Sequence, residues 1–511
     1  MANRYRSTWL RDVMCTILLL CLGAAFAVPC GIGYVAADDD GRHYAHVGAH
    51  SEVITGAVLK AKPEWRERVI LDALRVTVLY AERAGEAVCL LAYDICEITR
   101  REVVPLKKAV GGALGIDPER VHALCSHTHS SSSDDTEHDT ATLTAKSIAA
   151  AVGAKSRAAA VRDVCFLRVD TGKRFNINRR SAHGELGTWC LMQSRGCTDD
   201  GEIVDGTQWV RDKLVSFGAT QEEVTKVTGP IDAMRENDPF VELILFPKVH
   251  GGYAGGLVRF TAHPVVCSAG YWKPNLGRDY PGPLCDRLSE QFGCPILFLQ
   301  GPCGDHRTRH RDVGIAERDR IGLGLAESLV AQLDETRTFP FDRLDHASRS
   351  VMCPLSKEVP DSAGDANRGA REIRKQLEQL PHGKEWLTRR KELAELNAFY
   401  HNAARVLTGS SYLTKEEAEN RQAALIVSHI AFGDVHLLSF PGELFSTVAK
   451  GLDHAADGPT VVASFADGVT GYLMPRNDLA EGGYESTWAL FTPESVSALK
   501  TTVLELIRQC E

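Results

Sequence analysis

The strongest constraint on the fold is an order of apolar strand-like and helix-like segments that occurs more than once along the chain. Residues 73–98 hold two apolar runs around a polar turn, which is typical of two antiparallel strands. Residues 103–116 then space their apolar side chains as one face of a helix, and residues 120–127 form a short, largely apolar strand. This stretch predicts a strand, a turn, a strand, a helix and a further strand.

The same order returns later in the chain. Residues 257–266 are strand-like, residues 281–293 start with a proline and continue at helical spacing, and residues 294–307 run from an apolar strand into a Gly-rich loop. Such alternation predicts an α/β fold, with a mixed β-sheet core flanked by helices. Strand-end loops in such a fold gather in one place, and we expect the functional residues there.

Two further segments complete the predicted catalytic domain, which covers residues 28–511. Residues 357–425 are rich in Glu, Lys, Arg and Ala, and they predict surface helices inserted into the domain. Residues 426–443 predict a hairpin with Gly433 and Asp434 at its turn. We see no Pro/Ser-rich linker, which favours one domain over two.

The N-terminus predicts export. Arg4, Arg6 and Arg11 precede an apolar run over residues 14–27 that ends in small residues, so residues 1–27 are typical of a secretory signal peptide. An uncleaved membrane anchor is the alternative. We therefore expect a secreted, periplasmic or cell-surface protein.

Cysteine spacing and charge add two exclusions. The signal segment holds Cys15 and Cys21, which leaves 13 of the 15 cysteines without a CxxC pair, and this argues against a zinc ribbon or a thioredoxin-like motif. Disulfide pairing stays open. The net charge of −9 is spread along the chain without a basic stripe, so nucleic acid is not an expected partner.

Two histidines emerge where the strand of residues 120–127 ends. His127 and His129 are two residues apart, so on a strand both side chains leave by the same face. This geometry suits a metal ligand beside a second imidazole, although a hydrogen-bonded structural pair is an alternative. The HxHxDH pattern of dinuclear hydrolases does not fit, because Ser131 and Ser132 replace two of its ligands. For Asp134, Asp135 and His138, a solvated loop is favoured over metal binding.

Six motifs together resemble the neutral/alkaline ceramidase family, whose members are zinc-dependent amidohydrolases that cleave the N-acyl bond of ceramide. In chain order the motifs are CSHTHSS, FNINRR, FTAHPVV, LFLQGPCGDHR, SFPGE and GYLMP. The resemblance spans about residues 45 to 500. It implies one zinc ion with four ligands: His127, His263, Glu443 and Tyr472. Zinc accepts N and O donors, and in catalytic sites it keeps a position for a water whose pKa it lowers.

The resemblance also implies roles around the metal. His129 hydrogen-bonds near the reacting carbonyl, Arg179 lines the site, and Tyr484 faces the substrate. A guanidinium and a phenol placed there would stabilise the oxyanion that forms when water adds to an amide. For Arg179, a structural ion pair is the alternative reading.

The departures from the family pattern concern the nucleophile and the substrate. Arg307 stands where the family has a serine proposed to act in catalysis, so the attacking group would be water, with Asp305 or His306 assisting proton transfer. Cys303 is an alternative nucleophile that would need a lowered pKa. The family's Gly-Pro after the His pair is replaced by a run of serines and aspartates, residues 131–135, which points to an altered substrate. The family's C-terminal immunoglobulin-like domain has no room after Tyr484.

The sequence thus predicts a zinc-dependent hydrolase that cleaves the amide bond of an N-acylated small molecule or lipid. A zinc hydrolase of another amide or ester, and a catalytically silent zinc-containing relative that binds a lipid or glycan, are the alternatives. The oligomeric state and any contact with a membrane surface are left open.

Overall fold

The structure, a computed structural model, describes residues 44–131, 138–191, 196–197, 203–204, 206–227, 235–267, 275–310, 314–408 and 412–510. The predicted signal segment therefore lies outside the described residues, as does the predicted domain start at residue 28. Residues 44–511 cluster as one compact unit. No helix in its described part has the length and apolarity that a membrane span requires.

The first sheet has the strand order β5-β4-β3-β1-β6. β1, β3 and β4 are antiparallel neighbours, α3 crosses over from β4, and β5 returns parallel to β4. α4 then packs against β1 and β3. The bounds are β1 Ala45–Val53, β3 Arg75–Arg83, β4 Glu86–Tyr93, α3 Arg100–Leu114, β5 Val121–Cys125, α4 Thr140–Ser156 and β6 Ala159–Val161.

The second sheet, ordered β16-β14-β13-β7-β18, repeats this topology. β7, β13 and β14 are antiparallel neighbours, α7 follows β14, and β16 returns parallel to β14. α8 packs on β7 and β13. The bounds are β7 Asp163–Asp170, β13 Phe240–Pro247, β14 Tyr253–Phe260, α7 Pro281–Phe292, β16 Ile296–Gln300, α8 Ile315–Val330 and β18 Arg337–Pro340.

The third sheet, ordered β19-β20-β21-β23, follows the same plan with a shorter crossover. β19, β20 and β21 are antiparallel neighbours, α12 follows, and β23 is parallel to β21. α14 covers β19 and β20. The bounds are β19 Leu344–Pro354, β20 Gln422–Phe432, β21 Val435–Ser439, α12 Ser446–Ala449, β23 Thr460–Ala463 and α14 Pro493–Cys510.

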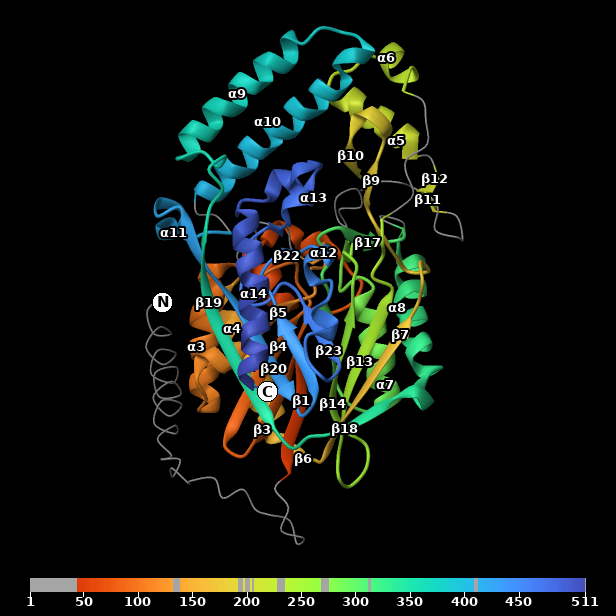
Figure 1. Ribbon diagram of the computed structural model, residues 1–511. Coiled ribbons are helices and arrows are strands. Elements are labelled where there is room, and N and C mark those ends of the chain that lie inside the picture. Colours follow the sequence, from red (N-terminus) through yellow and green to blue (C-terminus); the bar gives the residue numbers. More distant parts are fainter. Residues whose placement is uncertain are drawn as a thin grey trace, which may run out of the picture. The chain divides into compact units, whose positions relative to one another are not determined.

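One apolar core joins the three sheets. Leu90 of β4, Leu257 of β14 and Leu437 of β21 belong to the same buried cluster. Burying a leucine side chain contributes about 1.5–3 kcal/mol, so this shared core stabilises the sheets as one body. Figure 1 shows α3 and α4 on one side of the sheets and α7 and α8 on the other, with α14 running along β19 and β20.

Two insertions form what we call the cap, residues 171–239 and 355–421. Each lies between the first and second strand of its sheet, and Figure 1 shows both at the end of the molecule where α12, α13 and β17 also lie. Leu387 of the second insertion is buried with Leu214 and Trp189 of the first, which ties the two together. The cap elements are β8 Asn176–Asn178, β9 Arg180–Ala182, β10 Thr188–Cys190, β11 Gly196–Cys197, β12 Ile203–Val204, α5 Gly206–Ser216, α6 Gln221–Thr225, α9 Ala363–Gln379, α10 Leu387–Leu407 and α11 Lys415–Glu419.

The remaining elements are short and connect the sheets. They are α2 Thr55–Ala61, β2 Val69–Ile70, β15 Asn275–Leu276, β17 His306–Thr308, β22 Glu443–Leu444, β24 Tyr472–Leu473 and α13 Arg476–Ala480, with 3-10 turns η1 Pro63–Glu67, η2 Pro118–Arg120, η3 Gly184–Leu186, η4 Leu333–Glu335, η5 Lys384–Trp386, η6 Leu452–His454 and η7 Glu485–Trp488.

These observations confirm the predicted mixed α/β fold. The predicted hairpins are β3–β4 and β20–β21, the predicted helices of residues 103–116 and 281–293 are α3 and α7, and the segment 357–425 holds α9, α10 and α11. Candidate site residues follow the carboxyl ends of the paired parallel strands. His127 comes after β5, His263 after β14 and Glu443 after β21, so each sheet brings one of them.

Candidate metal centre

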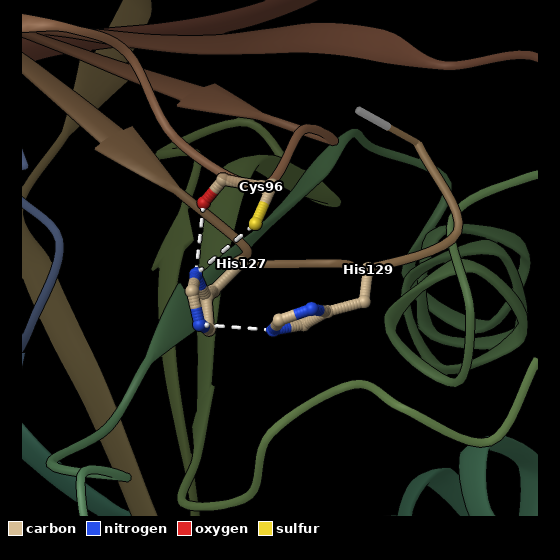
Figure 2. A group of neighbouring side chains, drawn as sticks. All are labelled: Cys96, His127 and His129. Carbon is tan, nitrogen blue, oxygen red and sulfur yellow. Dashed lines mark hydrogen bonds between the residues drawn. The ribbon is translucent and has the colours of Figure 1, made fainter. Parts of the chain in front are cut away.

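His127 lies in an unusual backbone conformation directly after β5. Its φ is +60°, in the left-handed region that residues other than glycine rarely adopt. The amide N of His127 donates to Ile95 O at 3.1 Å, which fixes this turn. The imidazole Nδ1 lies 3.0 Å from the carbonyl O of Cys96, as Figure 2 shows. Because a carbonyl can only accept, Nδ1 carries the proton and Nε2 keeps its lone pair.

A different backbone carbonyl fixes the tautomer of His263 in the same way. Its Nδ1 donates to His306 O at 2.8 Å, so its Nε2 also carries a lone pair. That Nε2 lies 2.9 Å from Glu443 Oε2. Backbone carbonyls that bind the second ring nitrogen are the usual means by which proteins orient a metal-binding histidine.

Glu443 begins β22, which pairs in parallel with β24. Its Oε2 lies 3.7 Å from His127 Nε2, and one ligand atom from each of His127, His263 and Glu443 lies within 4.8 Å of the others. All three side chains are buried. Two imidazole nitrogens and one carboxylate oxygen form a donor set that suits zinc. The three residues therefore fit a metal ion.

Tyr472 stands beside Glu443, because the two residues are register partners in the β22–β24 ladder. Its hydroxyl accepts a hydrogen bond of 2.8 Å from Arg179 Nη2. Burial raises the pKa of Tyr472 well above its usual value, and the Arg179 cation opposes that rise. The negative charge of Glu443 also raises the Tyr472 pKa, as expected for two neighbouring groups.

The His129 ring lies beside those of His127 and His263, with centroid distances of 4.6 Å and 5.8 Å. Its Nε2 lies 3.1 Å from His127 Nε2, as drawn in Figure 2. The backbone N of His129 donates to Pro264 O at 3.1 Å, which links the two histidine loops. His129 is half-buried, whereas His127 is buried. Cys96, His127 and His129 form a second group of side chains that could hold a metal ion.

Arg179 and Tyr484 meet at Tyr472. Arg179 is buried, and its Nε donates to Glu485 Oε1 at 2.9 Å, so it makes the ion pair that the sequence left as an alternative. The half-buried Tyr484 ring lies 6.2 Å from the Tyr472 ring between centroids. The structure thus gathers the predicted residues His127, His129, His263, Glu443, Tyr472, Arg179 and Tyr484 in one region.

Asp305 is a connector between loops. Its carboxylate accepts hydrogen bonds from His306 Nδ1, Ser446 N, Ser446 Oγ and Asn178 Nδ2 at 2.7 to 3.0 Å. Burial raises the pKa of Asp305, but these partners lower it more and hold it well below its usual range. His306 accepts from Asp238 N through its Nε2 at 3.0 Å. The geometry of this pair suits positioning better than proton transfer.

Arg307, at the serine position of the family, and Cys303, the alternative nucleophile, are both held in buried positions. Arg307 is buried, and its guanidinium donates to the carbonyls of Leu191, Thr308 and Arg309. Cys303 is also buried, and burial raises the pKa of its thiol well above its usual value. A thiol in this environment stays protonated, so the arrangement does not favour it as a nucleophile.

The loop after His129 lies partly outside the described residues, including Ser132, Asp134 and Asp135. His138 is described, and its Nδ1 lies 3.1 Å from Glu102 Oε1 at the start of α3. His138 therefore contacts the first turn of that helix. The thiols of Cys190, Cys267, Cys285, Cys294 and Cys303 are free.

Three site neighbours were missed by sequence reasoning: Cys96, Phe465 and Glu485. Cys96 follows the end of β4, and its position shortly after a predicted strand is the same signal that pointed to His127. Phe465 stacks on the His127 ring at 4.0 Å between centroids, and its φ of +56° matches that of His127. Glu485 sits in an ordinary polar stretch, and nothing in the sequence singles it out.

Comparison with known proteins bears on the fold. No family model and no curated protein sequence matches this chain. Neutral ceramidase from Pseudomonas aeruginosa aligns with a TM-score of 0.58 and 14% identity, over 91% of this chain and 74% of that one. A structure described as ceramidase complexed with C2 aligns with a TM-score of 0.60 and 14% identity, over 91% and 75%.

The fold of this chain is that of neutral ceramidase. The resemblance that the sequence motifs predicted is confirmed at this level. At 14% identity the likeness concerns the arrangement of the chain.

Proposed function

We propose that this protein is a zinc-dependent hydrolase of ceramidase type, which cleaves the amide bond of an N-acylated lipid. One observation carries the proposal: His127, His263 and Glu443 reach a common buried point from three different sheets, with ligand atoms within 4.8 Å of one another. The ceramidase fold supports the choice of substrate class.

The residues of the centre have separate tasks in this proposal. His127 and His263 present fixed Nε2 lone pairs, Glu443 adds a negative charge, and Tyr472 would be the fourth ligand. A zinc ion held there supplies Lewis-acid chemistry and a water of lowered pKa. Water is the proposed nucleophile, since Arg307 stands at the serine position and Cys303 is buried.

The neighbours of the centre handle the proton and the carbonyl. His129 is half-buried and lies 3.1 Å from His127, so it is placed to move a proton between the attacking water and the leaving amine. Tyr484 is half-buried beside Tyr472 and would hydrogen-bond the substrate carbonyl. Asp305 holds the loop of His306, whose carbonyl orients His263.

A substrate panel tests this function. Zinc-loaded protein is incubated with N-acyl sphingoid bases of several chain lengths, with fluorogenic N-acyl amides and with matched esters. We expect amide turnover that is lost on chelation, restored by zinc and abolished in Glu443→Gln. His429→Gln is the control, because His429 is a buried histidine of β20 that contacts His436.

The outcomes separate the alternatives. Turnover of esters alone would assign another hydrolytic activity. Zinc binding without turnover of any compound would leave a zinc-containing lipid- or glycan-binding relative and would overturn the enzyme proposal.

We also propose that the chain is exported through residues 1–27. The basic residues and the apolar run of this segment support the proposal. The N-terminal sequence of the protein recovered outside the cytoplasm tests it, since cleavage would place the new N-terminus close to residue 28.

A further inference from the structure

We propose that Glu485 is the positioning residue of the metal centre, because it holds Arg179 against the phenol of Tyr472. This inference rests on the proposed function in one respect, namely that a metal ion binds at His127, His263 and Glu443. It assigns a role to a residue that lies outside the ligand set.

Glu485 is a fully buried carboxylate shared by two consecutive arginines. It begins η7 and is 0% exposed. Its Oε1 accepts from Arg179 Nε at 2.9 Å, and its Oε2 accepts from Arg180 Nη1 at 2.8 Å. A buried carboxylate needs such partners, because burial without them strongly disfavours its charged form. The Glu485 pKa is accordingly lowered, with burial raising it and the two arginines outweighing that effect.

Arg179 connects Glu485 to the candidate ligand Tyr472. Its Nη2 donates to Tyr472 OH at 2.8 Å and to Gly304 O at 2.8 Å. With its Nε bound to Glu485, the planar guanidinium is held from two sides and has one orientation. The phenol oxygen of Tyr472 is thereby held beside Glu443, its register partner in the β22–β24 ladder.

Arg180 uses the other oxygen of Glu485 for a different purpose. Its Nη2 donates to Asp478 O and Gly482 O, both at 2.9 Å. Arg180 therefore secures the loop between α13 and η7, and no hydrogen bond of its described side chain reaches Tyr472. The two arginines share one buried partner, but only one of them contacts a ligand candidate. This difference provides an internal control.

The test compares Glu485→Gln, Arg179→Lys and Arg180→Lys. The readouts are zinc affinity measured by competition with a chelating dye, the visible spectrum of the Co²⁺-loaded protein, and the melting temperature of the metal-free protein. Loss of a residue that orients a metal ligand typically weakens metal binding by about 10 to 100-fold. We expect this loss and a changed Co²⁺ spectrum in Glu485→Gln and Arg179→Lys.

Arg180→Lys should lower the melting temperature while zinc affinity and the Co²⁺ spectrum stay those of the wild type. The double variant Arg179→Lys/Glu485→Gln should lose no more zinc affinity than the single ones, since both changes break one chain of contacts. If Glu485→Gln does not fold, Arg179→Lys decides, because lysine keeps the buried positive charge but lacks the planar guanidinium that spans Glu485, Gly304 and Tyr472.

Two results would overturn the inference. One is unchanged zinc affinity in Glu485→Gln or in Arg179→Lys, and the other is an equal loss of zinc affinity in Arg180→Lys, which would make Glu485 a purely structural anchor. Failure of the wild-type chain to bind zinc would instead contradict the proposed function, so the two failures are distinguishable.

Discussion

The decisive features at the scale of single residues are hydrogen bonds from main-chain carbonyls. Cys96 O and His306 O each bind the Nδ1 of one histidine, so that the Nε2 atoms of His127 and His263 keep their lone pairs and lie 3.7 Å and 2.9 Å from Glu443 Oε2. Sequence reasoning proposed these three residues from strand-end motifs and from a family resemblance. It could not find the carbonyls, because every residue carries one and only the folded backbone shows where it points.

The surroundings of Asp305 could not be predicted from the sequence either. Its motif suggested a part in catalysis, while in the folded chain its carboxylate accepts from three different segments. Which partners surround a carboxylate depends on contacts between segments more than a hundred residues apart, and local patterns do not encode them.

A pH-dependent stability follows from this environment. The folded pKa of Asp305 lies below its unfolded value of about 3.9, so its contribution to stability is complete above that value and is lost as the pH falls through the folded pKa. Asp305→Asn should reduce the free energy of unfolding at neutral pH by about 1.5–3 kcal/mol. Denaturant unfolding from pH 7 to 3 should show a smaller acid-induced loss in the variant, and parallel curves would contradict this.

Arg307→Ser tests whether the serine position can be restored. Because the Arg307 guanidinium supplies donors to three main-chain carbonyls, we expect a loss of roughly 2–5 kcal/mol in the free energy of unfolding and no gain of turnover. Denaturant unfolding and the amide assay check the two expectations. Arg83→Ser is a control at an exposed hydrogen bond to Asp342 O. Normal stability with faster amide hydrolysis would show that serine chemistry was available.

At the scale of elements, the short strands β22 and β24 bring the ligand candidates together. Hairpins and single helices are readable from apolar spacing, and the predicted hairpin at Gly433 and Asp434 is confirmed. A two-residue strand such as Glu443–Leu444 has no periodicity to read, so the pairing of Glu443 with Tyr472 emerges only from the fold.

Gly442 directly precedes Glu443 and lies in a turn that leads into the pairing of Glu443 with Tyr472. Its φ is +64°, and a Cβ there would lie 2.1 Å from Thr470 Oγ1 and 2.6 Å from Gly471 O. Gly442→Ala should therefore cost roughly 1–3 kcal/mol of stability and weaken zinc binding as well. Gly451→Ala is the matched control, since Gly451 has a φ of +83° with nothing within 4 Å of the added carbon. Equal zinc affinity in both variants would show that the turn does not set the centre.

At the scale of the whole molecule, the centre is built by three copies of one topology. Each copy has antiparallel strands, a crossover and a parallel strand, and the loops at the strand ends supply His127, His263 and Glu443. The copies share no sequence pattern beyond strand and helix periodicity, because different side chains satisfy the same backbone arrangement. The mixed α/β class, the recurrence of the pattern in the first two sheets and the helical insertion within residues 357–425 were predictable from the sequence, whereas the third copy and the insertion at residues 171–239 were not.

The most direct test of the account is the zinc stoichiometry of the purified chain, measured by elemental analysis after dialysis against zinc-free buffer. The account predicts about one zinc ion per chain, retained in the control His429→Gln and lost in His263→Gln and Glu443→Gln when all three variants are folded. A wild-type chain that holds no zinc at micromolar supply, or a His263→Gln variant that holds as much as the wild type, would contradict it.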